Sequence, residues 1–330
     1  MPHHPKRGSL AFSPRKRAKR HYSRIRREIK TSKNQIVGFS AYKAGTTHVL
    51  MIDDRKNVSS ANKELSKVVT VLDAPPMHVI AIRLYKKENM TKKLITEAWT
   101  SNITQDLLRK LTLPEKLDHN QNLEEIQSKL NTDSEYDIRV VVATQPRLTK
   151  IKKRPDVMEY CVGGKSALEK FEYAKEKLGK EVSIKEIFSE GEYIDVSAIT
   201  KGKGTEGFVK RWGVRIQNRK SKQKDRHVGS IGPWTPAGVM WTVPNVGQLG
   251  FHQRTEYNKR ILKTGDNGIE ITPSGGFLGY GLVRGEYVIV AGTVPGPRSR
   301  LIRMNPAVRS KYPTVKPNIT YISVESKQGV

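Results

Sequence analysis

Residues 36–53 read IVGFSAYKAGTTHVLMID, and this stretch decides the fold class. Its β-branched and aromatic residues are typical of strands, and Lys43-Ala44-Gly45 predicts a turn between two of them. Further strands are expected at 68–72 and 78–85, on either side of the break Ala74-Pro75-Pro76. This part of the chain therefore predicts antiparallel β structure.

The rest of the chain adds strands and one clear helix. The further predicted strands are 136–144, 193–200, 208–216, 286–294 and 319–324. Residues 164–178 predict a helix with one apolar face, ended by Gly179. Ser183 and Glu186 have the spacing of a capping box, which predicts a short second helix through Phe188. The fold class is mainly β with some α: a small antiparallel barrel or sandwich with a helical insertion and long basic extensions.

The charge balance points to a polyanionic partner. The chain has 60 Lys and Arg against 32 Asp and Glu, a formal net charge of +28. A compact domain so charged repels itself unless counter-charge is supplied, and nucleic acid supplies it through its phosphates. An anionic membrane is the rival, but we find neither a basic amphipathic helix nor an apolar run of spanning length. The start leads into charge, unlike a signal peptide, so a cytoplasmic protein with no membrane partner is expected.

The first 33 residues form a basic segment. They contain twelve Lys or Arg and a single acid, Glu28. Such a segment cannot bury enough apolar surface to offset its ordering entropy. Two interpretations stay open: a disordered tail or localisation signal, and an arm that becomes ordered against RNA.

Residues 97–135 have the opposite charge. Eight acids stand against four bases there. We expect this stretch to face solvent rather than RNA.

Residues 201–230 carry ten bases and two acids and lead into a loop rich in Gly and Pro. Pro233 and Pro236 flank Trp234 and restrict the backbone on both sides, so the indole can be presented at the end of a turn. A large aromatic side chain in a basic loop can stack on an unpaired RNA base. We favour this RNA contact for Trp234 over packing in a local core.

Trp241 invites the opposite interpretation. It follows Val239 and Met240 directly. We therefore expect Trp241 to pack in a small local core.

Several motifs of catalysis or ligand binding fail in their context. Gly202-Lys-Gly204-Thr-Glu-Gly207-Phe-Val209 matches a glycine loop of kinases and nearly that of dinucleotide folds, but a strand is expected at 208–216 where the latter needs a helix, and the other kinase motifs are missing. The end of a phosphate loop at 163–166 lacks its first glycine, because Glu159 stands there.

Single residues give no catalytic or metal site either. Cys161 cannot form an intramolecular disulfide and is interpreted as a buried structural thiol. The eight histidines lack ligand spacing, so phosphate contact or solvent exposure is expected for them. No metal, no cofactor and no enzymatic activity are expected.

Long strings of the sequence resemble the family of universal large-subunit ribosomal protein number three, and its archaeal members most. They are Pro5-Lys-Arg-Gly-Ser-Leu-Ala-Phe12, Gly38-Phe-Ser-Ala-Tyr-Lys-Ala-Gly-Thr-Thr-His48, Thr200 to Gly213, Gly229 to Trp241, Gly247 to Lys259, Val294-Pro-Gly-Pro-Arg298 and Asn305-Pro-Ala-Val-Arg309. The resemblance covers nearly the whole chain. It implies a six-stranded β-barrel like that of translation factors, with two extensions that thread into the rRNA.

The resemblance also implies a function. It implies a structural constituent of the large ribosomal subunit that binds 23S rRNA, acts early in assembly and has large-subunit proteins as neighbours, without forming a homo-oligomer. Its central loop is expected to reach the peptidyl transferase centre with Pro233, Trp234, Thr235 and Pro236 at the tip. Many eukaryotic relatives have histidines where this chain has Thr235 and Gly238, so no histidine role is carried over.

Composition and resemblance together yield the expected rRNA-binding residues. They are Lys6, Arg7, Arg15, Lys16, Arg17, Lys19, Arg20, Lys201, Lys203, Lys210, Arg211, Arg215, Arg219, Lys220, Lys222, Lys224, Arg226, Trp234, His252, Arg254, Lys259, Arg298 and Arg300. A third basic patch is expected from the carboxy-terminal bases Arg298, Arg300, Arg303, Arg309, Lys311 and Lys316.

The expected organisation has six parts. They are a basic extension (1–34), a first part of the barrel (35–96), an α/β insertion (97–190), barrel strands leading into the loop (191–216), a central basic loop extension with little regular structure (217–284), and closing barrel strands with a basic carboxy-terminal segment (285–330). Two other functions were weighed: an RNA-modifying enzyme, which needs a cofactor pocket or a carboxylate cluster, and a general DNA or chromatin binder.

Overall fold

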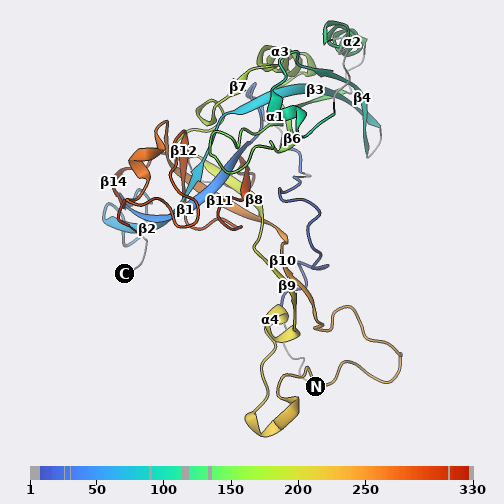
Figure 1. Ribbon diagram of the computed structural model, residues 1–330, viewed down its shortest axis with the longest axis vertical. Coiled ribbons are helices and arrows are strands. Elements are labelled where there is room, and N and C mark those ends of the chain that lie inside the picture. Colours follow the sequence, from blue (N-terminus) through green and yellow to red (C-terminus); the bar gives the residue numbers. More distant parts are fainter. Residues whose placement is uncertain are drawn as a thin grey trace. The chain divides into compact units, whose positions relative to one another are not determined.

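The computed structural model describes residues 8–25, 27–29, 31–88, 91–112, 119–132, 136–310 and 313–326. The chain divides into two compact units. Unit 1 consists of residues 1–21 and 199–254, and unit 2 of residues 22–198 and 255–330. The described residues are mainly β with few helices, as predicted (Figure 1). None of the described helices is long and apolar enough to cross a membrane.

Seven strands form the larger sheet of unit 2. Their order is β13 (Leu301–Pro306), β8 (Tyr193–Ile199), β11 (Gln253–Gly265), β12 (Tyr287–Ala291), β2 (Glu64–Asp73), β1 (Phe39–Ile52) and β14 (Ile319–Ile322). One edge of β1 pairs with β2, while the other pairs first with β13 and then with β14. The pairing of β1 with β13 therefore joins the next-to-last strand of this order to the first one.

The predicted turn at Lys43-Ala44-Gly45 is wrong. These residues lie inside β1, where the register against β2 shifts between Lys43 and Gly45, as in a β-bulge. Ala44 is fully buried, and a Cβ on Gly45 would lie 2.5 Å from Cδ1 of Phe277. The glycine therefore permits close packing under an aromatic ring and does not reverse the chain.

A second sheet of unit 2 carries most of the helices. Its order is β4 (Thr91–Trp99), β3 (Met77–Glu88), β5 (Tyr136–Ala143) and β6 (Val157–Cys161), and β7 (Glu181–Val182) pairs with β3. The helices of this region are α1 (Gln105–Leu108), α2 (His119–Thr132) and α3 (Ala167–Lys177), with the 3-10 turn η1 (Ile184–Glu186). α2 contacts β4, and α3 contacts β5.

The predicted helix at 164–178 is confirmed as α3. The Ser166 side chain accepts from the backbone N–H of Glu169 at 3.2 Å, and Gly179 follows the helix with a φ of +76°. The expected capping box is present at η1, where the Ser183 N–H donates to Glu186 at 3.3 Å. Cys161 is half-buried in β6, and burial raises the pKa of its thiol.

The two sheets and the predicted parts do not coincide. β3 and β4 lie before residue 97, yet they pair with β5 and not with β1 or β2. The expectation of little regular structure in 217–284 is wrong, since β10 (Gly247–Gly250), β11 and the 3-10 turn η3 (Gly268–Ile271) lie there. In β11 the apolar pair at 261–262 is buried, but flanking charged residues hide its pattern in the sequence.

One hydrophobic cluster joins both sheets of unit 2. It includes Phe39 and Ile302 of the larger sheet and Ile82 and Val140 of the second. The acidic stretch lies on the second sheet and its helices. Within it Glu97 pairs with Arg83 at 2.9 Å and Asp106 with Arg147 at 2.9 Å, Glu124 and Glu125 are exposed, and Glu115, Asp118, Asp133 and Glu135 fall outside the described residues.

A buried carboxyl group makes the stability of unit 2 depend on pH. Asp73 is 2% exposed and accepts a hydrogen bond from the Tyr280 hydroxyl at 2.7 Å. Burial raises the pKa of Asp73 to about 6. Because the folded state holds this proton more tightly than the unfolded chain, the contribution of Asp73 to stability is fully present below its unfolded pKa of about 4 and is lost as pH rises through 6.

Asp73→Asn should therefore stabilise unit 2 at neutral pH. The amide stays uncharged and can still accept from Tyr280, so the gain at pH 7 is at most about 2–3 kcal/mol. Denaturant unfolding at pH 4 and pH 7 measures it. The same difference in stability between the variant and the wild type at pH 4 and at pH 7 would contradict the assignment.

Candidate nucleic-acid interface

Unit 1 contains a two-stranded antiparallel ribbon. β9 (Gly202–Glu206) pairs with β10, with Gly247 opposite Glu206 (Figure 1). Gly250 has a φ of +70°, and a Cβ there would lie 2.0 Å from the Lys201 carbonyl oxygen. Only glycine fits this position, so the ribbon depends on it.

The predicted strand at 208–216 is wrong. Residues Phe208–Trp212 form the helix α4, which Gly213 ends with a φ of +71°. Phe208 and Trp212 are four residues apart, a spacing that suits a helix face as well as strand alternation. Trp212 is buried, and its Nε1–H donates to the Asn245 carbonyl at 3.0 Å.

The glycine motif at 202–209 is followed by α4 and not by the strand that the sequence predicts, so the expected strand is no ground against a dinucleotide site. Gly202 and Gly204 lie in β9, one strand of an antiparallel ribbon, while Gly207 is the N-cap of α4, which has only 5 residues. A dinucleotide motif instead joins a parallel strand to a helix whose N-terminus holds the pyrophosphate.

Residues 8–21 of the basic arm pack against this ribbon and helix. The guanidinium carbon of Arg15 lies 3.8 Å from the centroid of the Trp212 ring, and Arg15 donates to the Arg211 carbonyl. The N–H of Ala18 donates to the Phe251 carbonyl at 2.8 Å. This part of the arm therefore belongs to the same unit as the central extension.

The expected exposure of the histidines is wrong for two of them. His252 is 6% exposed, and its Nδ1–H donates to the Lys16 carbonyl at 2.8 Å. His78 is also 6% exposed, and its Nε2 bonds the Gly179 carbonyl at 3.2 Å. His252 therefore holds the basic arm in place by a hydrogen bond at Lys16.

Three half-buried arginines of unit 1, Arg15, Arg211 and Arg254, lie close enough to repel one another. Burial, and next the nearby charge of Arg15, lower the pKa of both Arg211 and Arg254. Guanidinium groups stay charged at neutral pH, so these residues repel one another without losing charge. Aromatic faces partly compensate, since Arg254 lies 4.3 Å from the Phe12 centroid and Arg17 lies 5.5 Å from that of Phe251.

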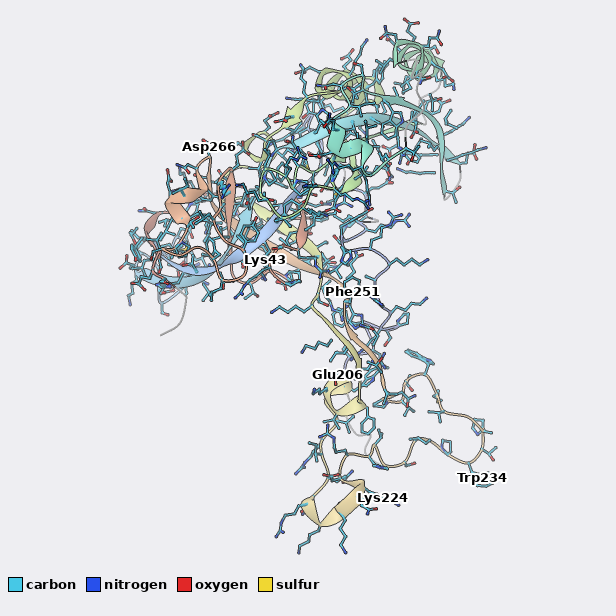
Figure 2. All side chains as sticks on the ribbon, viewed as in Figure 1. Lys43, Glu206, Lys224, Trp234, Phe251 and Asp266 are labelled. Carbon is cyan, nitrogen blue, oxygen red and sulfur yellow. The ribbon has the colours of Figure 1, made fainter. Side chains whose placement is uncertain are left out.

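Most predicted cations of unit 1 are exposed. These are Lys16, Arg17, Lys19, Arg20, Lys201, Lys203, Lys210, Arg215, Arg219, Lys220, Lys222, Lys224 and Arg226. Lys210 lies 3.4 Å from Glu206. The 3-10 segment η2 (Arg219–Lys224) holds four of the others, and Figure 2 shows the side chains around Lys224 pointing away from the ribbon. The structure brings these charges together in one unit, where they can meet several phosphates.

The loop after η2 presents aromatic side chains to solvent. Trp234 is 96% exposed and stands away from its loop in Figure 2, and Pro233, Thr235 and Pro236 are also exposed. The expectation that Trp241 packs in a local core is wrong, because Trp241 is 69% exposed. Neighbouring apolar residues in sequence did not become neighbours in a core.

The remaining residues that are expected to bind rRNA lie in unit 2 or outside the described residues. Lys6 and Arg7 lie outside the described residues. In unit 2, Lys259 pairs with Glu256 at 2.7 Å, Arg298 is exposed, and burial lowers the pKa of the half-buried Arg300.

The expected carboxy-terminal patch is wrong for one of its members. Arg303 is buried, donates to the Glu159 carbonyl at 2.8 Å and lies over Tyr160. Lys316 pairs with Glu190 at 3.0 Å. Lys311 lies outside the described residues, so the patch is smaller than its six bases suggest.

Sequence reasoning did not assign Phe12, Trp212 or Phe251 to the site. Each lies under a guanidinium group of unit 1. The available signal was an aromatic residue in or beside a basic run, which favours a cation–π pair.

Comparison with known proteins agrees with this picture. The family model described as ribosomal protein L3 matches residues 1–329. The chain is similar to large ribosomal subunit protein uL3 of Methanopyrus kandleri, with 53% identity covering 100% of this chain and 92% of the relative. The protein of the same name from Methanothrix thermoacetophila is 50% identical over 99% of both chains, and that of Archaeoglobus fulgidus 51% identical over 99% of both. The chain therefore belongs to the ribosomal protein L3 family.

Proposed function

We propose that this protein is a structural constituent of the large ribosomal subunit and binds the rRNA of that subunit through unit 1. The observation that carries the proposal is the charge of this unit. Residues 8–21 contain five Lys or Arg and residues 199–254 contain eleven, against only Glu206 and Asp225 as acids. A polyphosphate offsets the repulsion among these cations, and each neutralised phosphate releases a counterion.

Unit 2 supplies the folded anchor. The circuit of pairings β13–β8–β11–β12–β2–β1–β13 supports a six-stranded barrel of the kind that the family resemblance implies. A barrel has no free sheet edge, so it stays folded beside RNA without pairing with other chains. The exposed acids Glu124 and Glu125 of the acidic stretch lie in unit 2, and we expect them to face solvent rather than RNA.

The protein is not an enzyme and acts in the cytoplasm as part of the subunit. It joins the 23S rRNA early in assembly, has other large-subunit proteins as neighbours and is not a homo-oligomer. Its loop tip at 233–236 reaches towards the peptidyl transferase centre. The exposed indole of Trp234 supports this placement, because a rigid aromatic group can stack on a base there.

Sedimentation tests the proposal. The tagged full-length chain, expressed in an archaeal cell, should sediment with large subunits after a moderate-salt wash, because phosphate contacts are many and the anchor is folded. Recovery of the chain in the ribosome-free fraction at that salt would overturn it.

Trp234→Ala tests the loop tip. Since Trp234 is 96% exposed, its truncation should change the free energy of unfolding by less than about 0.5 kcal/mol. Subunits carrying the variant should differ in tRNA accommodation or in sensitivity to drugs of the peptidyl transferase centre. A variant that fails to fold would show that the indole is core, and unchanged accommodation and sensitivity would place the loop elsewhere.

A further inference from the structure

The central extension changes character at residue 227. Residues 215–226, which we call the charged limb, contain six Lys or Arg and one acid, Asp225. Residues 228–246, which we call the neutral limb, contain no Lys, Arg, Asp or Glu. Both limbs lie in the same basic unit, so composition alone separates them.

The neutral limb exposes apolar side chains along its length. The exposed ones are Ile231, Trp234, Val239, Met240, Trp241 and Val246. Met240 is 63% exposed and Trp241 is 69% exposed. Exposing a large apolar side chain has a cost in water, and where several such side chains gather in one segment they mark a candidate binding site.

Trp241 lies in a turn, and the chain just after this turn is hydrogen-bonded to α4. The Val243 N–H donates to the Met240 carbonyl at 3.1 Å, which closes a turn around Trp241. Four residues after Trp241, the Asn245 carbonyl accepts from the Trp212 Nε1–H at 3.0 Å and from Arg211 at 2.9 Å. The indole is therefore presented by a loop end that is tied to α4, whereas Trp234 lies seven positions earlier in the neutral limb.

The composition of the neutral limb and the charge of unit 1 determine which class of molecule can bind there. Its surface must suit a flat indole and a thioether, and the many cations of unit 1 favour a partner with negative charge. Single-stranded nucleic acid combines both properties, because its phosphates are anionic and its bases have apolar faces that stack on aromatic side chains. An acidic protein segment would supply the charge, but its carboxylate side chains have no flat apolar face to lie against an indole.

We propose that Trp241, with Met240 beside it, is a second base-stacking site of this protein, which binds an unpaired base of the large-subunit rRNA. The charged limb holds phosphates, and the neutral limb holds bases at two separate points, Trp234 and Trp241. The inference rests on the proposed function and adds that the two limbs bind different parts of the RNA.

Salt dependence separates the two kinds of contact. The full-length chain is titrated with deproteinised large-subunit rRNA over a range of salt concentrations. Trp241→Ala should weaken binding by roughly 5- to 100-fold at every salt concentration and leave the slope of log K against log salt unchanged, because stacking releases no counterion. Trp241→Phe should recover most of the affinity. The matched charge variant, Lys220→Ala with Lys222→Ala, should instead reduce the slope by about 2.

Chemical probing of the rRNA identifies the base. One unpaired nucleotide that the wild-type chain protects should become reactive with Trp241→Ala and stay protected with Trp234→Ala. Leu168→Ala, which truncates an exposed apolar residue of unit 2, controls for unspecific effects and should leave affinity and protection unchanged.

The outcomes are distinguishable. If the wild-type chain does not bind this rRNA more tightly than duplex DNA, the proposed function fails. If the wild-type chain binds but Trp241→Ala binds equally well, only the second stacking site is overturned. An effect of Trp241→Ala on intact subunits but not on deproteinised rRNA would assign the limb to a protein neighbour, and loss of fold in unit 1 would assign Trp241 to a core. Both results contradict the proposal.

Discussion

Replacing Arg219, Lys220, Lys222 and Lys224 together by glutamine should weaken binding to large-subunit rRNA by roughly 100- to 1000-fold at about 0.15 M salt. All four side chains lie in η2 and are exposed. If each meets one phosphate, the slope of log K against log salt falls by about 3.6, since each contact contributes about 0.9. The loss should shrink as the salt concentration rises.

The matched control removes the same charge elsewhere. Lys93, Lys110, Lys175 and Lys180 are exposed residues of the second sheet and its connections in unit 2. Their joint replacement by glutamine should leave the slope within about one contact of the wild-type value. Equal losses in the two quadruple variants would mean that net charge, and not the position of η2, determines binding.

Trp212→Ala should unfold unit 1 and leave unit 2 folded. Trp212 is buried, stacks on Arg15 and donates to the Asn245 carbonyl, so its removal opens a cavity and releases both partners. Truncating a buried tryptophan costs about 3–5 kcal/mol. A small unit with so few apolar residues does not have a free energy of unfolding large enough to offset this loss.

Hydrogen exchange measures this result residue by residue. The amide of Ala18, bonded to Phe251, should lose its protection in Trp212→Ala, while that of Val71 in β2 should keep it. Trp234→Ala is the matched control, because it removes the same side chain from an exposed position and should protect both amides as the wild type does. Persisting protection of Ala18 in Trp212→Ala would show that the arm is held by other contacts.

Local patterns predicted the strands that contain an unbroken run of β-branched residues and the helix that has one apolar face. β2 and β5 end in buried runs of this kind, and α3 buries Phe171 and Ala174, so all three lie where the sequence placed them. β11 was missed since Arg260, a buried residue of that strand, breaks the pattern. Its guanidinium is buried because it donates to Asp54 at 2.8 Å and to the Val315 carbonyl at 2.7 Å, and a partner 206 positions away cannot be seen in a local window.

Spacing alone was ambiguous around Trp212. Apolar residues at 208, 212, 214 and 216 fit a strand, but those at 208 and 212 also fit one face of a helix. Gly213 decides between the two, because its left-handed backbone ends α4. The glycine was visible in the sequence, yet the need for a φ of +71° was not.

The sequence predicted which types of residue the candidate site contains, but not how these residues are arranged. The charge run of residues 201–230 pointed to the cations that unit 1 now exposes. Arg15 of the first basic segment and Arg211 of this run instead hold the arm and the ribbon together, through Trp212 and Asn245. Which basic residues serve the fold and which remain for phosphates depends on contacts between residues far apart in sequence.

The most direct test of the account is the salt dependence of rRNA binding by the wild-type chain. We expect log K to fall with log salt at a slope steeper than about −6, and binding to large-subunit rRNA to exceed binding to duplex DNA by roughly 1000-fold at about 0.15 M salt. A slope shallower than about −2, or equal affinity for the two nucleic acids, would contradict the claim that unit 1 is built around rRNA.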